Sequence, residues 1–246
     1  MSVAACAARV RRADPDRFRA VMTAPVPARA ALFPLFAFNL EVARAPWVSA
    51  EPMIGEMRLQ WWRDAVAEIA DGGAPRAHEV AVPLAEVMRA RALPVAVLDA
   101  LIAARRSDLE RVPFADDSAL ETYLEATGGG LMWLAALACG APADAEEAVR
   151  RAGWAAGLAN YLRAVPDLEA RGRLPLPDGR AEAVAALARE GLRRLSAARR
   201  ARPPAACVPA RRSLAAQAPV HELATCAPDR QRRLPGDVAA EAGGHH

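Results

Sequence analysis

The sequence predicts an all-α protein, on three observations. Apolar residues recur at spacings of three and four along most of the chain, helix-end signals separate these segments, and no stretch alternates as a half-buried strand does. The clearest example is 51–70, where Ile54, Met57, Trp61 and Ala65 form one apolar stripe. A chain of 246 residues that is 53% hydrophobic can bury a sizeable core between such helices.

Eight helices are expected, most of them bounded by recognisable signals. Asp14-Pro15-Asp16 combines a capping side chain, a proline at the first helical position and an acid in the first turn, so a helix begins there and ends before Pro25. Pro34 lies inside the second segment and should kink it. The remaining predicted helices cover about 28–45, 51–70, 75–92, 94–111, 117–139, 144–165 and 181–201.

The helical pattern defines one domain, 14–201, with a short N-terminal arm, 1–13, before it. After residue 201 the periodicity stops. Six prolines and a cluster of arginines replace the large apolar residues, which predicts a poorly ordered C-terminal tail over 202–246.

Charge and cysteine usage exclude several classes of function. The net charge of +3 and the lack of a repeated basic and aromatic pattern argue against a nucleic-acid partner. Four widely spaced cysteines with no Cys-x-x-Cys pair indicate a reducing compartment and no structural metal. No secretory signal is visible, and the longest uncharged run, 128–143, is shorter than the ~20 residues of a transmembrane helix. The expected location is the cytoplasm, with peripheral contact at the inner face of the membrane.

Several segments resemble the squalene/phytoene synthase family, whose enzymes join two prenyl diphosphates head to head. Residues 29–45 resemble the helix that carries the first acidic motif, and 155–177 resemble the second-motif helix and its exit. Tyr123 with Gly128 to Gly130 resembles the pocket helix between them. The residues that carry the resemblance most clearly are Gln60-Trp61-Trp62-Arg63-Asp64, Gly157-Leu158-Ala159-Asn160-Tyr161-Leu162-Arg163 and Arg171-Gly172-Arg173-Leu174-Pro175-Leu176-Pro177.

The resemblance implies an isoprenoid-synthase-like helical bundle around a central apolar cavity. The segments 33–38 and 129–137 are apolar around their whole circumference, so we expect them to line that cavity. A lipid or isoprenoid tail could fit there.

The acidic motifs of the family are degenerate in this chain. Active members place two aspartates four residues apart on each helix, so that both carboxylates share a face and hold Mg²⁺ against a diphosphate. In the first motif Glu41 is the only acid. In the second, Ala164 and Leu168 replace the aspartates, Asp167 lies beside them, and Pro166 is expected to interrupt the helix. No metal site is predicted.

The resemblance therefore implies a member that has lost Mg²⁺-dependent prenyl diphosphate chemistry. Such a protein would bind an isoprenoid or lipid tail, or a respiratory-complex subunit, as the subgroup related to complex I assembly factors suggests. One alternative is an active prenyltransferase of the squalene or phytoene synthase type, acting with Mg²⁺ on farnesyl or geranylgeranyl diphosphate. Another is a helical scaffold with no pocket. The candidate pocket and anion-binding residues are Glu41, Tyr123, Gly129, Asn160, Arg163, Asp167 and Arg173.

Overall fold

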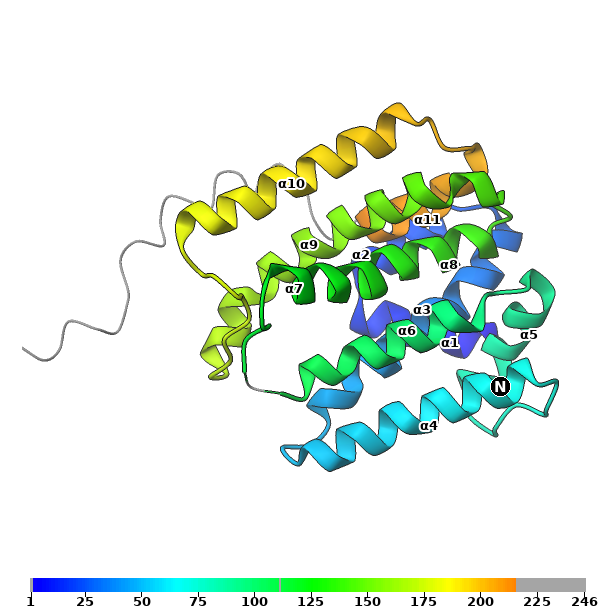
Figure 1. Ribbon diagram of the computed structural model, residues 1–246. Coiled ribbons are helices and arrows are strands. Elements are labelled where there is room, and N and C mark those ends of the chain that lie inside the picture. Colours follow the sequence, from blue (N-terminus) through cyan, green and yellow to red (C-terminus); the bar gives the residue numbers. More distant parts are fainter. Residues whose placement is uncertain (1, 111, 216–246) are drawn as a thin grey trace, which may run out of the picture.

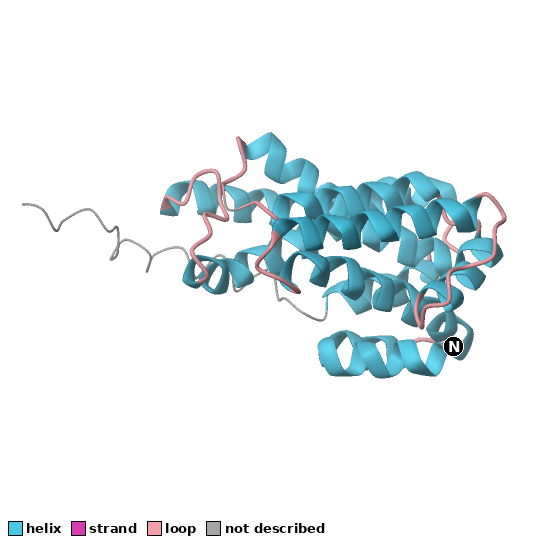
Figure 2. Cartoon of the chain, turned by 90° about the horizontal axis from the view of Figure 1, so that it is seen from below, coloured by secondary structure: helices cyan, strands magenta, loops and turns pink. Residues whose placement is uncertain are grey.

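The structure, a computed structural model, describes residues 2–110 and 112–215. All regular structure in these ranges is helical (Figures 1 and 2), as the sequence predicts. The helices pack side by side around one large core, and a smaller apolar cluster lies between α7, α9 and α10.

The first helix is part of the folded domain. Helix α1 (Val3–Ala13), capped by the Ser2 side chain, packs on α3, and buries Cys6 and Val10 in the main core. The predicted N-terminal arm is therefore wrong. Its packed face consists of Val3, Cys6, Ala7 and Val10, a short stripe of small and medium-sized side chains without the large apolar residues that mark most core helices.

Helix α3 (Val26–Arg44) runs through the centre of the bundle and follows α2 (Pro15–Met22), which Asp14 caps as expected. It continues through Pro34 as one helix. Together with the short η1 (Ala45–Trp47) it is long and apolar enough to cross a membrane, but 61% of its most apolar window is buried inside the fold. Its apolar surface is thus used by the packing of the domain.

The remaining helices follow the predicted order with adjusted ends. The predicted helix 117–139 contains a π-helical turn, η3, and the predicted helix 94–111 ends in a short 3-10 turn, η2. The elements are α4 (Pro52–Ala70), α5 (Ala81–Arg91), α6 (Val95–Ala104), η2 (Arg105–Asp108), α7 (Asp117–Leu124), η3 (Glu125–Gly129), α8 (Gly130–Ala138), η4 (Ala143–Ala145), α9 (Glu146–Ala170), α10 (Ala181–Arg200), η5 (Ala205–Cys207) and α11 (Val208–Ala215).

Helix α9 passes through Pro166 without a break, which corrects the predicted interruption. Pro166 is exposed and close to the end of the helix, so water can solvate the carbonyl that loses its partner. Helix α9 is consequently long enough to present a continuous face to the centre of the bundle.

The folded part also extends beyond the predicted boundary at residue 201. Helix α11 packs on α2 and α8, and Cys207 and Ala210 are fully buried. Small residues fill the space there, so the segment lacked the large apolar residues that mark a core helix in a sequence. The rest of the predicted tail, 216–246, lies outside the described residues.

Candidate functional site

A cavity of about 290 Å³ opens between α3, η2, the α7–η3 segment and α9. Of the two segments expected to line it, 129–137 contributes Leu131, whereas 33–38 contributes none and the same helix lines the cavity further along. Asn39, Ala43 and Leu131 line the cavity, whereas Phe33, Phe36 and Phe38 are buried in the core. The cavity is thus central, as expected, but its walls are mixed rather than purely apolar.

Two helix faces meet across the cavity, and neither carries a carboxylate. Helix α3 contributes Asn39 and Ala43, four residues apart, and α9 contributes Asn160, Ala164 and Leu168 at the same spacing. These are the faces on which a pair of metal-binding carboxylates would have to lie, because residues i and i+4 of a helix share a side. Amide and aliphatic side chains at these positions neither neutralise the charge of Mg²⁺ nor bind the ion strongly.

Asp108 is the single carboxylate of the lining, and neighbouring side chains already engage it. The Tyr123 hydroxyl donates to Asp108 at 3.1 Å, and Arg105 donates to the Tyr123 oxygen at 2.7 Å and to Asp108 at 3.3 Å. Burial raises the pKa of Tyr123 above its ordinary value, so the phenol keeps its proton and remains a donor to Asp108.

A resident Mg²⁺ therefore does not fit this cavity. No group of three or more His, Cys, Asp or Glu residues that could hold a metal ion occurs in 2–110 or 112–215. The cavity instead contains two arginines, Arg105 and Arg17, the second of which pairs with Asp14 at 3.0 Å. An anion or a polar lipid head group matches these walls better than a cation does.

Two buried polar atoms in cavity-lining residues have no hydrogen-bond partner within the described chain. One is an acceptor, Asn39 Oδ1, and the other a donor, Arg105 Nε. Leaving a buried polar atom unpaired costs roughly 1–3 kcal/mol. Both atoms are shielded from solvent, so a ligand reaches them only if neighbouring side chains move. A hydroxyl could then pair with either atom, whereas an ionised phosphate oxygen, which only accepts, could pair with Arg105 Nε alone.

Of the predicted site residues, Tyr123 and Asn160 lie in the cavity wall. Gly129 does not, because the Glu125 carboxylate occupies the space beside it, and the neighbouring Gly128 lines the cavity instead. Arg173 lines a second cavity, also of about 290 Å³, which shares Asp108, Tyr161 and Leu168 with the first. Arg163 and Asp167 are exposed and line neither cavity, since they lie on the outer side of α9.

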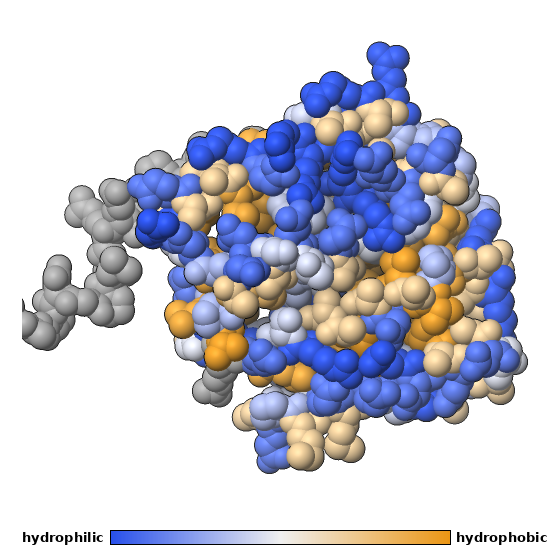
Figure 3. All heavy atoms as spheres, in the orientation of Figure 1, coloured by the Kyte–Doolittle hydropathy of each residue, from blue (hydrophilic) through white to orange (hydrophobic). Residues whose placement is uncertain are grey.

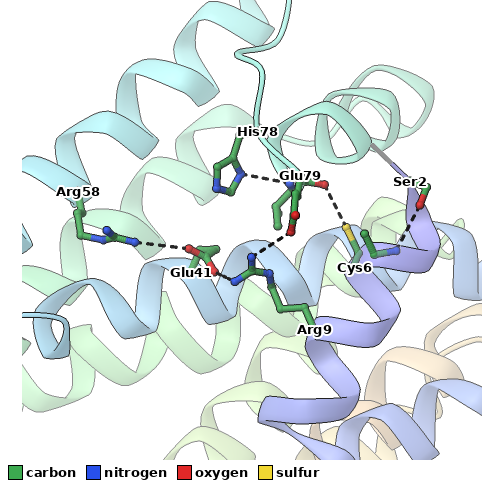
Figure 4. Close-up of polar contacts among 9 residues, drawn as sticks. Ser2, Cys6, Arg9, Glu41, Arg58, His78 and Glu79 are labelled. Atoms are coloured by element: carbon green, nitrogen blue, oxygen red, sulfur yellow. Dashed lines mark hydrogen bonds and ion pairs between the residues drawn. The ribbon is translucent and has the colours of Figure 1, made fainter.

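Glu41 belongs to a different, structural cluster (Figure 4). It is buried between Arg9 of α1 and Arg58 of α4, and Arg9 also reaches Glu79 at 3.3 Å. His78 lies near it and accepts a hydrogen bond from the Val80 amide. Glu41 thus joins three helices and is not part of the cavity, because it lies on another face of α3 than Asn39 and Ala43.

Replacing Glu41 by glutamine is expected to lower the free energy of unfolding by about 2 kcal/mol, because it leaves Arg9 without its buried partner. Urea denaturation measures the change. Glu79→Gln is the matched control, since Glu79 is 65% exposed and should cost no more than about 0.5 kcal/mol. Equal effects of the two substitutions would contradict a structural role for Glu41.

The sequence did not reveal Arg105, Asp108, Asn39 or Arg17 as site residues. Arg105 and Asp108 lie in a run of charges after α6, where such residues usually face solvent. Asn39 lies within a very apolar helix and Arg17 within a short surface-type helix. Only the tertiary contacts bring these side chains to one cavity.

The helical architecture and the cavity between α3 and α9 define a protein of the isoprenoid-synthase fold. A dehydrosqualene synthase crystal structure matches with a TM-score of 0.71 at 16% identity, covering 83% of this chain and 79% of that one. Squalene synthase HpnC from Alicyclobacillus acidocaldarius matches with a TM-score of 0.78 at 16% identity, covering 92% and 94%. At such identity the likeness shows the fold alone.

The sequence comparison identifies the family. The sequence model of squalene/phytoene synthases matches residues 10–224, so the chain belongs to the squalene/phytoene synthase family. NADH dehydrogenase (ubiquinone) complex I, assembly factor 6 from Bos taurus is 30% identical over 173 residues, covering 70% of this chain and 52% of that protein. Its Drosophila melanogaster homolog is 32% identical, covering 65% and 50%. The chain spans about half the length of these curated relatives.

Proposed function

We propose that this protein works as an assembly-type factor for respiratory complex I and uses its central cavity to bind an isoprenoid or another lipid, without Mg²⁺-dependent prenyl diphosphate chemistry. In this proposal it acts in the cytoplasm, in contact with the inner face of the membrane. The similarity to complex I assembly factor 6 supports the partner. The helix faces without carboxylates in the cavity wall support the loss of Mg²⁺-dependent prenyl diphosphate chemistry.

The observation that carries this proposal is the uncharged pair of helix faces formed by Asn39 and Ala43 on α3 and by Asn160, Ala164 and Leu168 on α9. Ionising a prenyl diphosphate needs compensation of the negative charge that develops on the leaving group, and metal ions supply several kcal/mol of it. The arginines of the cavity are partly neutralised by Asp108 and Asp14, so they are a poor replacement.

Deleting the gene in the source organism is expected to lower the amount of assembled complex I strongly, while squalene-type and phytoene-type products persist. Native gel electrophoresis and NADH oxidation measure the amount of assembled complex I, and lipid analysis measures the squalene-type and phytoene-type products. The wild-type gene should restore assembly. Ala164→Phe should fail to do so, because the ring would fill the cavity, whereas Ala170→Phe, an exposed site on the same helix, should restore it.

Two results would contradict the proposal. One is normal complex I in the deletion strain. The other is a loss of prenyl condensation products, which would favour the prenyltransferase. Full restoration of complex I by a folded Ala164→Phe protein would show that assembly does not depend on the cavity.

A further inference from the structure

Exposed apolar side chains concentrate at one end of the molecule. Of the ten large apolar side chains that are exposed in the described ranges, seven come from the start of α4 and the loops next to η1, η2 and α9. We call them the apolar tip. Its members are Trp47, Val48, Met53, Ile54, Met57, Val112 and Leu174.

Direct contacts hold these segments together. The Arg173 guanidinium lies 4.4 Å from the Trp47 ring centroid and donates at 2.9 Å to the Glu110 carbonyl, so it ties the loop after α9 to η1 and to the loop after η2. Arg106 of η2 pairs with Glu56 of α4 at 2.6 Å. The tip therefore brings together segments at the lower left of Figure 1, where the first turns of α4 and the end of α9 lie, and the same corner of Figure 3 shows apolar spheres divided by hydrophilic ones.

The two methionines of the tip protrude from α4. Met53 is 73% exposed and Met57 66% exposed, and they lie four residues apart on one side of α4. Side chains that line a protein-binding groove are partly enclosed by their neighbours, whereas these methionines project outward. Apolar side chains that project in this way fit the fluid apolar layer of a membrane better than a binding surface of fixed shape on another protein.

Arginines surround the tryptophan of the tip. Arg171 lies 5.3 Å from the Trp47 ring centroid, Arg173 lies on the same ring, and Arg44 ends the helix three residues before it. None of the three has a carboxylate partner in the described part of the chain. The carboxylates of Glu51, Glu110, Asp167 and Glu169 are exposed on the same and neighbouring segments, so the positive charge is limited to the arginines beside Trp47.

The tip also borders both cavities. Trp47 lines the central cavity, and Val112 and Leu174 line the neighbouring one. A surface inserted into lipid at this point would place the cavity mouths at the membrane, where an apolar ligand is available.

We propose that the apolar tip inserts into the interfacial layer of a lipid bilayer, with Trp47 at the head-group level and Arg44 and Arg171 at lipid phosphates. Tryptophan and arginine prefer this layer, and apolar side chains below it gain the hydrophobic free energy of burial. This inference rests on the membrane contact of the proposed function and names the surface that makes it; it does not depend on whether the cavity has chemistry or on the complex I partner.

Flotation of the full chain with vesicles tests the tip. The wild-type protein should bind phosphatidylcholine vesicles weakly and vesicles that also contain phosphatidylglycerol more tightly. Met53→Gln with Met57→Gln keeps the helix propensity of α4 and should weaken binding to both by at least about tenfold. Arg44→Gln with Arg171→Gln should remove most of the preference for phosphatidylglycerol, by about fivefold for each arginine.

The matched control is Met22→Gln with Val26→Gln. Both side chains are exposed and apolar; Met22 ends α2 and Val26 begins α3, about 28 Å along α3 from the tip. This control should bind as the wild type does. Failure of the wild-type protein to float with either vesicle would overturn the proposal and indicate that a protein covers the tip. Equal loss in the control and in the Met53 and Met57 variant would overturn it as well.

Discussion

Replacing Gly153 by alanine is expected to lower the free energy of unfolding by about 3 kcal/mol, near the upper end of the usual cost of overpacking a core. A Cβ atom at this position would lie 2.5 Å from the Gly128 carbonyl oxygen and 2.9 Å from the Gly129 Cα. Both are backbone atoms, so no side chain can move away to make room. The contact joins η3 to α9, which together form one wall of the central cavity.

Two other glycines provide controls for this measurement. At Gly191 the nearest atom to an added Cβ is the end of the Leu158 side chain at 3.0 Å, and a flexible side chain can adjust. At Gly179 nothing lies within 4 Å. Denaturation should therefore show a small change for Gly191→Ala and almost none for Gly179→Ala. A loss at Gly153 no larger than at Gly179 would contradict the close approach of η3 and α9.

The order of the helices could be predicted from the sequence because periodicity and end signals agree along most of the chain. Asp14 caps α2 as the sequence predicts, and the helix predicted over 51–70 is α4, which ends at Ala70. The errors are local. Residues 75–80 were assigned to a helix but form a loop, in which Arg76 pairs with Glu68 of α4 at 2.6 Å. Such a contact between distant positions leaves no periodic signal.

The candidate site was predicted in part for the same reason. Tyr123 and Asn160 lie on helices whose register the motifs define, and both reach the cavity. Glu41, the acid of the first motif, lies outside the cavity because its face of α3 turns toward Arg9 and Arg58. Only the packing of α1 on α3 reveals this, and the sequence had suggested no packed helix there.

The proposed absence of Mg²⁺-dependent prenyl transfer has a positive control in a designed variant. Asn160→Asp with Ala164→Asp would place two carboxylates four residues apart on the α9 face of the cavity. Without metal, two unpaired and partly buried charges should destabilise the protein by about 3 kcal/mol. Added Mg²⁺ should restore much of this stability in the variant and change little in the wild type.

The most direct measurement is incubation of the unmodified full chain with labelled farnesyl and geranylgeranyl diphosphate, with and without Mg²⁺, followed by chromatography of the lipid products. We expect no condensation product above the protein-free control under either condition. Mg²⁺-dependent formation of phytoene or dehydrosqualene, which need no reductant, would contradict it if Asp108→Asn abolished that formation, because it would make the one carboxylate of the cavity wall a metal ligand.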